Sequence, residues 1–172
     1  MNALATPQQV ARVGFLSSVG IALFVLESLV PLPVPFLKLG FANISSVVAL
    51  ELMGPVPMLF VVLIRVLAGS LLTGSMFSPS FLLALAAGLA SGCAMALCRS
   101  VAGTLLSAVG VSLIGAATHV LAQLLIVSYL FVQNEAVMGL FPLLLLSAVA
   151  GGLIVGVISL RLLNGLQRGG VS

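Results

Sequence analysis

The sequence predicts an all-α integral membrane protein with six transmembrane helices, folded as one transmembrane domain over residues 1–172. Hydrophobic residues make up 62% of the chain and charged residues only 5%, whereas a soluble domain carries about 25% charged residues because its surface faces water. The mean hydropathy of +1.39 agrees with this reading. Apolar stretches near the ~20 residues that a spanning helix needs alternate with short breaks. Lipid is therefore the expected solvent for most of the surface.

Proline, glycine and capping residues set the limits of the expected helices. Thr6-Pro7 and Ser78-Pro79 each place a capping side chain before a first-turn proline, whose missing N–H costs nothing there. Proline-rich or glycine-containing breaks separate the first three spans. The fifth stretch exceeds a straight span, so its first turns are expected to lie obliquely or to kink near Gly110. The expected spans are 7–30, 36–53, 57–73, 79–98, 104–131 and 137–163.

The positive charges predict the orientation in the membrane. With six spans, four arginines fall on the side of the two termini, against one lysine on the other side, which favours both termini in the cytoplasm of a multi-pass cell-membrane protein. Five spans would separate the last two arginines from the others. The four arginines are Arg12, Arg99, Arg161 and Arg168, and the opposite side has Lys38 and Glu135.

Small residues at intervals of four mark one face on each of three helices. Such a face lets two backbones approach closely, which is how helices associate in lipid. Packing inside the bundle is one interpretation, and docking of the first helix through Gly14, Ser18 and Ala22 on a partner membrane subunit is the other. The remaining two faces comprise Ala84, Gly88, Gly92 and Ala96 in the fourth helix and Gly152 and Gly156 in the sixth.

Arg65 lies near the centre of the third expected helix. An arginine at that depth costs about 2.5–3.5 kcal/mol on insertion scales, so it must face the bundle interior or a wet cavity. An internal ion pair with Glu27 or Glu51 is one explanation. Direct contact with a ligand is the other.

One face of the fifth helix carries Ser112, Gly115, His119 and Gln123 at the spacing of helix neighbours. Hydrogen-bonding side chains beside the gap left by a glycine predict a polar cavity, although a lone helical histidine is usually a satisfied interhelical bond. With one histidine and no aspartate in the chain, no metal site is expected. Six basic and three acidic side chains are too few and too scattered for a nucleic-acid surface.

Lys38, Gly40 and Asn43 gather polar groups at the mouth of the second expected helix, directly after a proline-rich run. Gly40 permits close backbone approach. Lys38 has two explanations: a side chain that reaches the headgroup interface, or a gate residue over a cavity.

Three blocks of the chain resemble those of a known family. Residues 38–44 (KLGFANI) are similar to its K-L-G-x-A-N signature, and residues 64–67 (IRVL), Gly74 and 78–83 (SPSFLL) follow in the expected order. Residues 110–123, with His119 and Gln123, resemble its G-x-S-x-x-G-A-x-x-H-N-x-x-Q block, except that Val120 replaces the usual asparagine and removes one expected polar contact. On these motifs, over roughly residues 10–160, the chain resembles the Gx transporter family, also called heptaprenyl diphosphate synthase component I.

The resemblance implies the six-helix fold of the S components of energy-coupling-factor transporters. In those proteins the first loop caps a ligand cavity on the extracellular side, and small residues of the first helix contact a transmembrane coupling subunit. ATPases on separate chains supply the energy, which agrees with the lack of a phosphate-binding glycine loop in this sequence.

The expected function is that of a substrate-binding membrane subunit of a transporter for a small, vitamin- or cofactor-like solute with an anionic group. The alternative is a non-catalytic accessory subunit of an isoprenoid, quinone or flavin-linked redox system. Neither catalysis nor a resident cofactor is expected, because prenyl elongation holds magnesium and diphosphate with aspartate-rich motifs and this chain has no aspartate. The predicted ligand-binding residues are Lys38, Gly40, Asn43, Arg65, Ser112, Gly115, His119 and Gln123.

Overall fold

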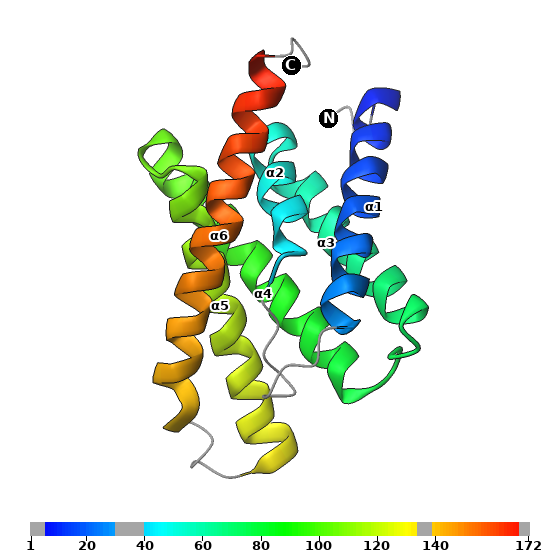
Figure 1. The fold of residues 1–172 in the computed structure, drawn as a ribbon, viewed down its shortest axis with the longest axis vertical. Coiled ribbons are helices and arrows are strands. Elements are labelled where there is room, and N and C mark those ends of the chain that lie inside the picture. Colours follow the sequence, from blue (N-terminus) through cyan, green and yellow to red (C-terminus); the bar gives the residue numbers. More distant parts are fainter. Residues whose placement is uncertain (1–5, 30–39, 134–138, 169–172) are drawn as a thin grey trace.

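Six α-helices pack into a bundle in the computed structural model, which describes residues 6–29, 40–133 and 139–168 (Figure 1). Within these residues, five helices are long and apolar enough to cross a membrane, and the sixth, α2, is shorter. The predicted all-α membrane bundle is confirmed. The helices are α1 (Pro7–Leu29), α2 (Asn43–Met53), α3 (Pro55–Leu72), α4 (Pro79–Ala102), α5 (Ala108–Ile126) and α6 (Phe141–Arg168), with a 3₁₀ turn η1 (Gly103–Leu105) before α5 and a π-helical segment η2 (Val127–Val132) after it.

The central helix of the bundle is α2, which contacts α1, α3, α5 and α6. Every residue from Ile44 to Leu50 is buried, including Ser45 and Ser46. Its 11 residues extend only about 16 Å, roughly half of the hydrocarbon core. The expected span over 36–53 is therefore wrong in its described part: residues 40–42 are not α-helical, and residues 36–39 lie outside the described residues.

The turn that precedes α2 explains its late start. Gly40 has a φ of +77°, a conformation that a residue with a Cβ rarely adopts. The turn then closes through hydrogen bonds from the N–H of Asn43 to the Gly40 carbonyl at 2.9 Å and from the N–H of Ile44 to the Phe41 carbonyl at 3.0 Å. Hydropathy alone does not place the helix start at Asn43, because the apolar residues Phe41 and Ala42 directly before it are not α-helical.

Two predicted helix starts are confirmed. The Thr6 side chain accepts a hydrogen bond from the N–H of Gln9 at 3.3 Å, and the Gln9 side chain accepts one from the N–H of Thr6 at 3.2 Å. This reciprocal pair is a capping box before α1. Ser78 caps α4 by accepting from the N–H of Phe81 at 3.3 Å. Pro79 is the first residue of that helix.

The connection between α4 and α5 differs from the expectation. The α4 helix continues to Ala102 rather than ending near residue 98, and α5 begins at Ala108 rather than 104. Ser107, which was not predicted as a capping residue, caps α5 by accepting from the N–H of Gly110 at 3.3 Å. A 3₁₀ turn and a new helix start thus replace the oblique or kinked turns expected there.

Arg99 fastens this connection to the neighbouring end of α2. It forms an ion pair with Glu51, and its Nη1 donates to the carbonyl oxygens of Gly103 at 2.6 Å and Leu106 at 2.7 Å. Both charged side chains are about one-fifth exposed. Glu51 therefore forms its ion pair with Arg99. Of the two ion pairs considered for Arg65, the one with Glu51 is not formed.

Replacing Arg99 with alanine is expected to lower the free energy of unfolding by about 1–3 kcal/mol, because two carbonyls and a half-buried carboxylate lose their donor. The midpoint of thermal unfolding in detergent measures this change. The control is Arg161→Ala on the exposed surface of α6, which should change stability by less than about 0.5 kcal/mol. Equal effects of the two substitutions would show that the Arg99 contacts contribute nothing.

The small-residue faces have two different environments. A Cβ on Gly92 of α4 would lie 3.1 Å from Leu59 of α3, and one on Gly156 of α6 would lie 2.7 Å from the Cα of Val109 in α5. The faces of α4 and α6 therefore pack within the bundle. In α1, by contrast, Gly14, Ser18 and Ala22 are all exposed on the outer surface.

The helices alternate in direction, so that α1 begins and α6 ends at the same end of the bundle (Figure 1). The ion pair between Arg99 and Glu51 also belongs to this end, because it joins the last turns of α4 and α2. This end of the bundle therefore contains an ion pair between two of its helices.

Candidate functional site

A cavity beside the start of α2 brings together four of the predicted ligand-binding residues, one from each of three helices and one from a turn. It is called the Arg65 cavity below. Its volume is about 310 Å³, counting the open space at its mouth. The lining residues are Phe24, Glu27, Gly40, Ala42, Asn43, Arg65, Val66, Ala84 and His119.

Arg65 is the main cationic group of this cavity, and it is only 3% exposed. Its Nη2 donates to Oδ1 of Asn43 at 3.1 Å. Its Nε and Nη1 have no hydrogen-bond partner within the described part of the chain. A buried guanidinium with unused donors is costly to maintain, and an anionic acceptor that entered the cavity would satisfy those donors.

Glu27 supplies a negative charge to the same cavity. Its carboxylate accepts a hydrogen bond from the N–H of Phe41 in the turn before α2, and it attracts the Arg65 guanidinium electrostatically. A carboxylate is stabilised near a helix N-terminus by the helix dipole. Of the two acids that the sequence offered as partners of Arg65, Glu27 is the one that shares its cavity.

Gly20 of α1 determines how the Arg65 side chain lies. A Cβ at this position would be 3.0 Å from Cδ of Arg65 and 2.5 Å from Oγ of Ser45. The absence of a side chain lets the stem of Arg65 cross α1 on its way to Asn43. Gly20 was not predicted from the sequence, because the small-residue pattern of α1 follows the face of Gly14, Ser18 and Ala22, which is exposed on the outer surface.

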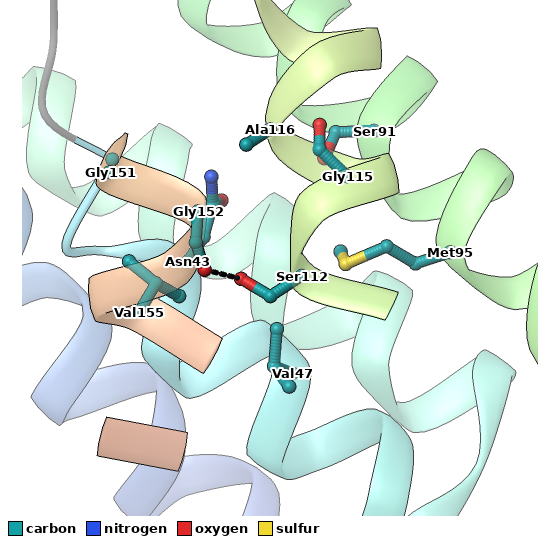
Figure 2. Close-up of a pocket in the computed structure, with 11 residues that line it drawn as sticks. Asn43, Val47, Ser91, Met95, Ser112, Gly115, Ala116, Gly151, Gly152 and Val155 are labelled. Carbon is teal, nitrogen blue, oxygen red and sulfur yellow. Dashed lines mark hydrogen bonds between the residues drawn. The ribbon is translucent and has the colours of Figure 1, made fainter. Parts of the chain in front are cut away.

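A second cavity, which Asn43 also lines, lies between α2, α4, α5 and α6 and is called the Gly152 cavity below (Figure 2). Its volume is about 250 Å³, again counting the open mouth. Two serine hydroxyls in its wall hold neighbouring helices together: Ser112 donates to the Gly152 carbonyl at 2.9 Å and Ser91 to the Gly115 carbonyl at 2.8 Å. The lining residues are Gly40, Asn43, Val47, Ser91, Met95, Ser112, Gly115, Ala116, Gly151, Gly152 and Val155.

The structure divides the predicted site residues between the two cavities. Gly40 and Asn43 line both, Arg65 and His119 line the first, and Ser112 and Gly115 line the second. Gln123 is buried on α5 and lines neither. Lys38 and the loop at 31–35 lie outside the described residues.

Two lining residues with polar side chains were not predicted as ligand contacts. Glu27 was considered only as an ion-pair partner of Arg65. The sequence feature that marks it is the presence of an acidic residue within an expected membrane span. Ser91 was not considered, although it lies next to Gly92 on the small-residue face of α4. Across residues 6–29, 40–133 and 139–168, no three His, Cys, Asp or Glu side chains gather closely enough to hold a metal ion.

Comparison with protein families gives one finding about the whole chain. The family model described as heptaprenyl diphosphate synthase component I matches residues 16–162, which include every residue that lines the two cavities. Comparison with curated proteins and with solved structures gives no match.

Proposed function

Since the chain belongs to the heptaprenyl diphosphate synthase component I family, we propose that it is the membrane-embedded, substrate-binding subunit of a transporter in that family. Its solute would be small, vitamin- or cofactor-like, and anionic. The observation that supports this most strongly is the buried Arg65 with unused donors at a cavity inside a membrane-type bundle. A protein that only assembles other subunits has no need to maintain such a group in an apolar interior.

The same residues argue against a catalytic role in prenyl transfer. Holding magnesium and diphosphate takes several carboxylates in one place, and the chain has no aspartate and three glutamates. Two of these glutamates are far apart and engaged elsewhere, Glu51 by Arg99 and Glu27 by the N–H of Phe41. The protein is therefore proposed to bind a solute rather than to transform it.

The proposed partners are a transmembrane coupling subunit and ATPases on separate chains. The exposed face of Gly14, Ser18 and Ala22 on α1 supports a membrane partner, because small exposed residues allow close helix approach. The excess of arginine at the end where α1 begins and α6 ends supports a cytoplasmic location for both termini. The ATPases would then act from that side.

Native mass spectrometry of the protein extracted from its own membrane in mild detergent tests the binding function. The expected result is a retained small molecule that carries a carboxylate or another anionic group. A retained molecule that is neutral or cationic would contradict the proposed chemistry of the Arg65 cavity.

Uptake of the identified molecule by cells tests the transport function, and ATP hydrolysis by a partner is expected to be essential. Uptake that persists in cells lacking every candidate ATPase would overturn the energised mechanism. The alternative, a non-catalytic accessory subunit of an isoprenoid, quinone or flavin-linked redox system, predicts instead that the protein purifies in a stable complex with flavoprotein subunits.

A further inference from the structure

The charges of the Arg65 cavity are balanced before any solute binds. Among the described residues that line it, Arg65 carries a positive charge and Glu27 a negative one, and the two attract each other. Both side chains are buried, with 3% of Arg65 and 8% of Glu27 exposed. An unbalanced charge in a buried site is costly. An anion that bound to Arg65 would therefore leave a net negative charge that has to be neutralised.

The helices around Glu27 supply no second positive charge within the described part of the chain. Its own helix, α1, packs mainly against α2 and α3. The charged group that α3 presents to the cavity is Arg65, and α2 carries only Glu51, which lies at the opposite end of that helix in an ion pair. From α5, His119 is the remaining titratable side chain among the described lining residues. The neutralising charge must therefore enter with the solute.

The space beside these two charges restricts what that positive charge can be. The enclosed part of the cavity has room for about one water molecule. The Arg65 side chain is also closely packed, since a Cβ on Gly20 would be 3.0 Å from its Cδ. An anionic oxygen that reached Arg65 through the mouth would fill this room, so a cationic group of the same solute would not fit beside Glu27. A proton needs no such space.

We propose that the anionic group of the solute binds to Arg65 together with one proton, and that the Glu27 carboxylate accepts this proton from water. Glu27 becomes a neutral carboxylic acid, so the charge of the cavity is the same before and after binding. One oxygen of the acid can still accept from the N–H of Phe41, and its O–H becomes a new donor in the cavity. This inference rests on the proposed function and names a second species, the proton, that the same site takes.

Titration of the protein in lipid nanodiscs with formate, the smallest carboxylate, tests the inference without knowledge of the natural solute. Formate is fully ionised between about pH 6 and pH 8. Over this range its affinity is expected to fall about tenfold per pH unit, which is the slope for uptake of one proton on binding. A pH-indicator dye should report one proton taken up per bound formate. The infrared difference spectrum with isotope-labelled formate should gain the C=O band of a protonated protein carboxyl group.

Glu27→Gln keeps an oxygen for the N–H of Phe41 but cannot ionise. In this variant the affinity for formate should be independent of pH and the infrared band should be absent. At the upper end of the pH range, formate should bind at least tenfold more tightly than to the wild type, because Arg65 then lacks its opposing charge. The matched control is Glu51→Gln, whose position lines neither cavity. It should retain both the slope and the band, as should His119→Gln.

The slope, the dye signal and the infrared band are all measured on the wild-type protein, so the test does not depend on the folding of a variant. The inference is overturned if formate binds through Arg65 without proton uptake, because another positive charge then balances it. It is also overturned if the uptake survives Glu27→Gln or is lost in His119→Gln. These results leave the proposed function standing. If formate does not bind, or binds equally well to Arg65→Gln, the proposed function fails and this inference fails with it.

Discussion

Arg65→Ala is expected to weaken binding of the molecule that copurifies with the protein by about 100- to 1,000-fold. The substitution removes Nε and Nη1, which have no partner within the described residues. Charge-assisted hydrogen bonds contribute about 1.5–3 kcal/mol each, and a loss of about 3–4 kcal/mol corresponds to this range of affinities. Titration of the purified protein with the molecule identified by native mass spectrometry gives the change directly.

Stability must be separated from binding in this experiment. Without the guanidinium, the buried carboxylate of Glu27 loses the charge that attracts it, and breaking a buried pair is itself destabilising. The double variant Glu27→Gln, Arg65→Ala removes that charge as well and should insert and remain monodisperse. If the double variant binds as tightly as the wild type, Arg65 is a structural residue and not a ligand contact. Arg65→Lys, which keeps the charge but loses the fork of donors, should bind with intermediate affinity.

The sequence predicts most of this fold because the membrane imposes the length of its elements. Capping residues placed the starts of α1 and α4 correctly, and the bundle architecture followed from composition. The start of α2 could not be predicted in the same way. It depends on the φ of Gly40 and on a hydrogen bond from Phe41 to Glu27, which is 14 residues away in the chain. Hydropathy does not distinguish a helix buried in protein from one that faces lipid.

The candidate site could likewise be predicted only in part from the sequence. Polar residues within an apolar chain attract attention wherever they fall, so Arg65, His119 and Asn43 were predicted to share a site before their positions were known. The placement of Ser112 and Gly115 in a second cavity was not predicted, since one face of α5 contributes to both cavities. Gly20 carries no polar group, and its contact with the Arg65 side chain exists only after α1 and α3 have packed. Such tertiary contacts leave no periodic pattern in the sequence.

Leucine at all three small positions of the exposed α1 face, in the variant Gly14→Leu, Ser18→Leu, Ala22→Leu, is expected to abolish assembly with the proposed coupling subunit and ATPases. Larger side chains would hold a partner helix away from the α1 backbone and remove the close packing on which association in lipid depends. ATP-dependent uptake should fall at least tenfold, and the partners should be lost on copurification. Binding of the copurifying molecule should be unchanged, because these three residues lie on the outer surface and line neither cavity.

The matched control introduces leucine at exposed small residues elsewhere on the bundle, Cys93 of α4 and Ala150 of α6, and should leave both assembly and uptake intact. The comparison distinguishes a specific docking face from a general effect of bulk at the lipid surface. If the α1 variant still assembles with its partners, this face only contacts lipid. If it loses solute binding as well, the substitutions act on the bundle itself. Only loss of assembly with retained binding identifies α1 as the element that couples the solute site to its energy source.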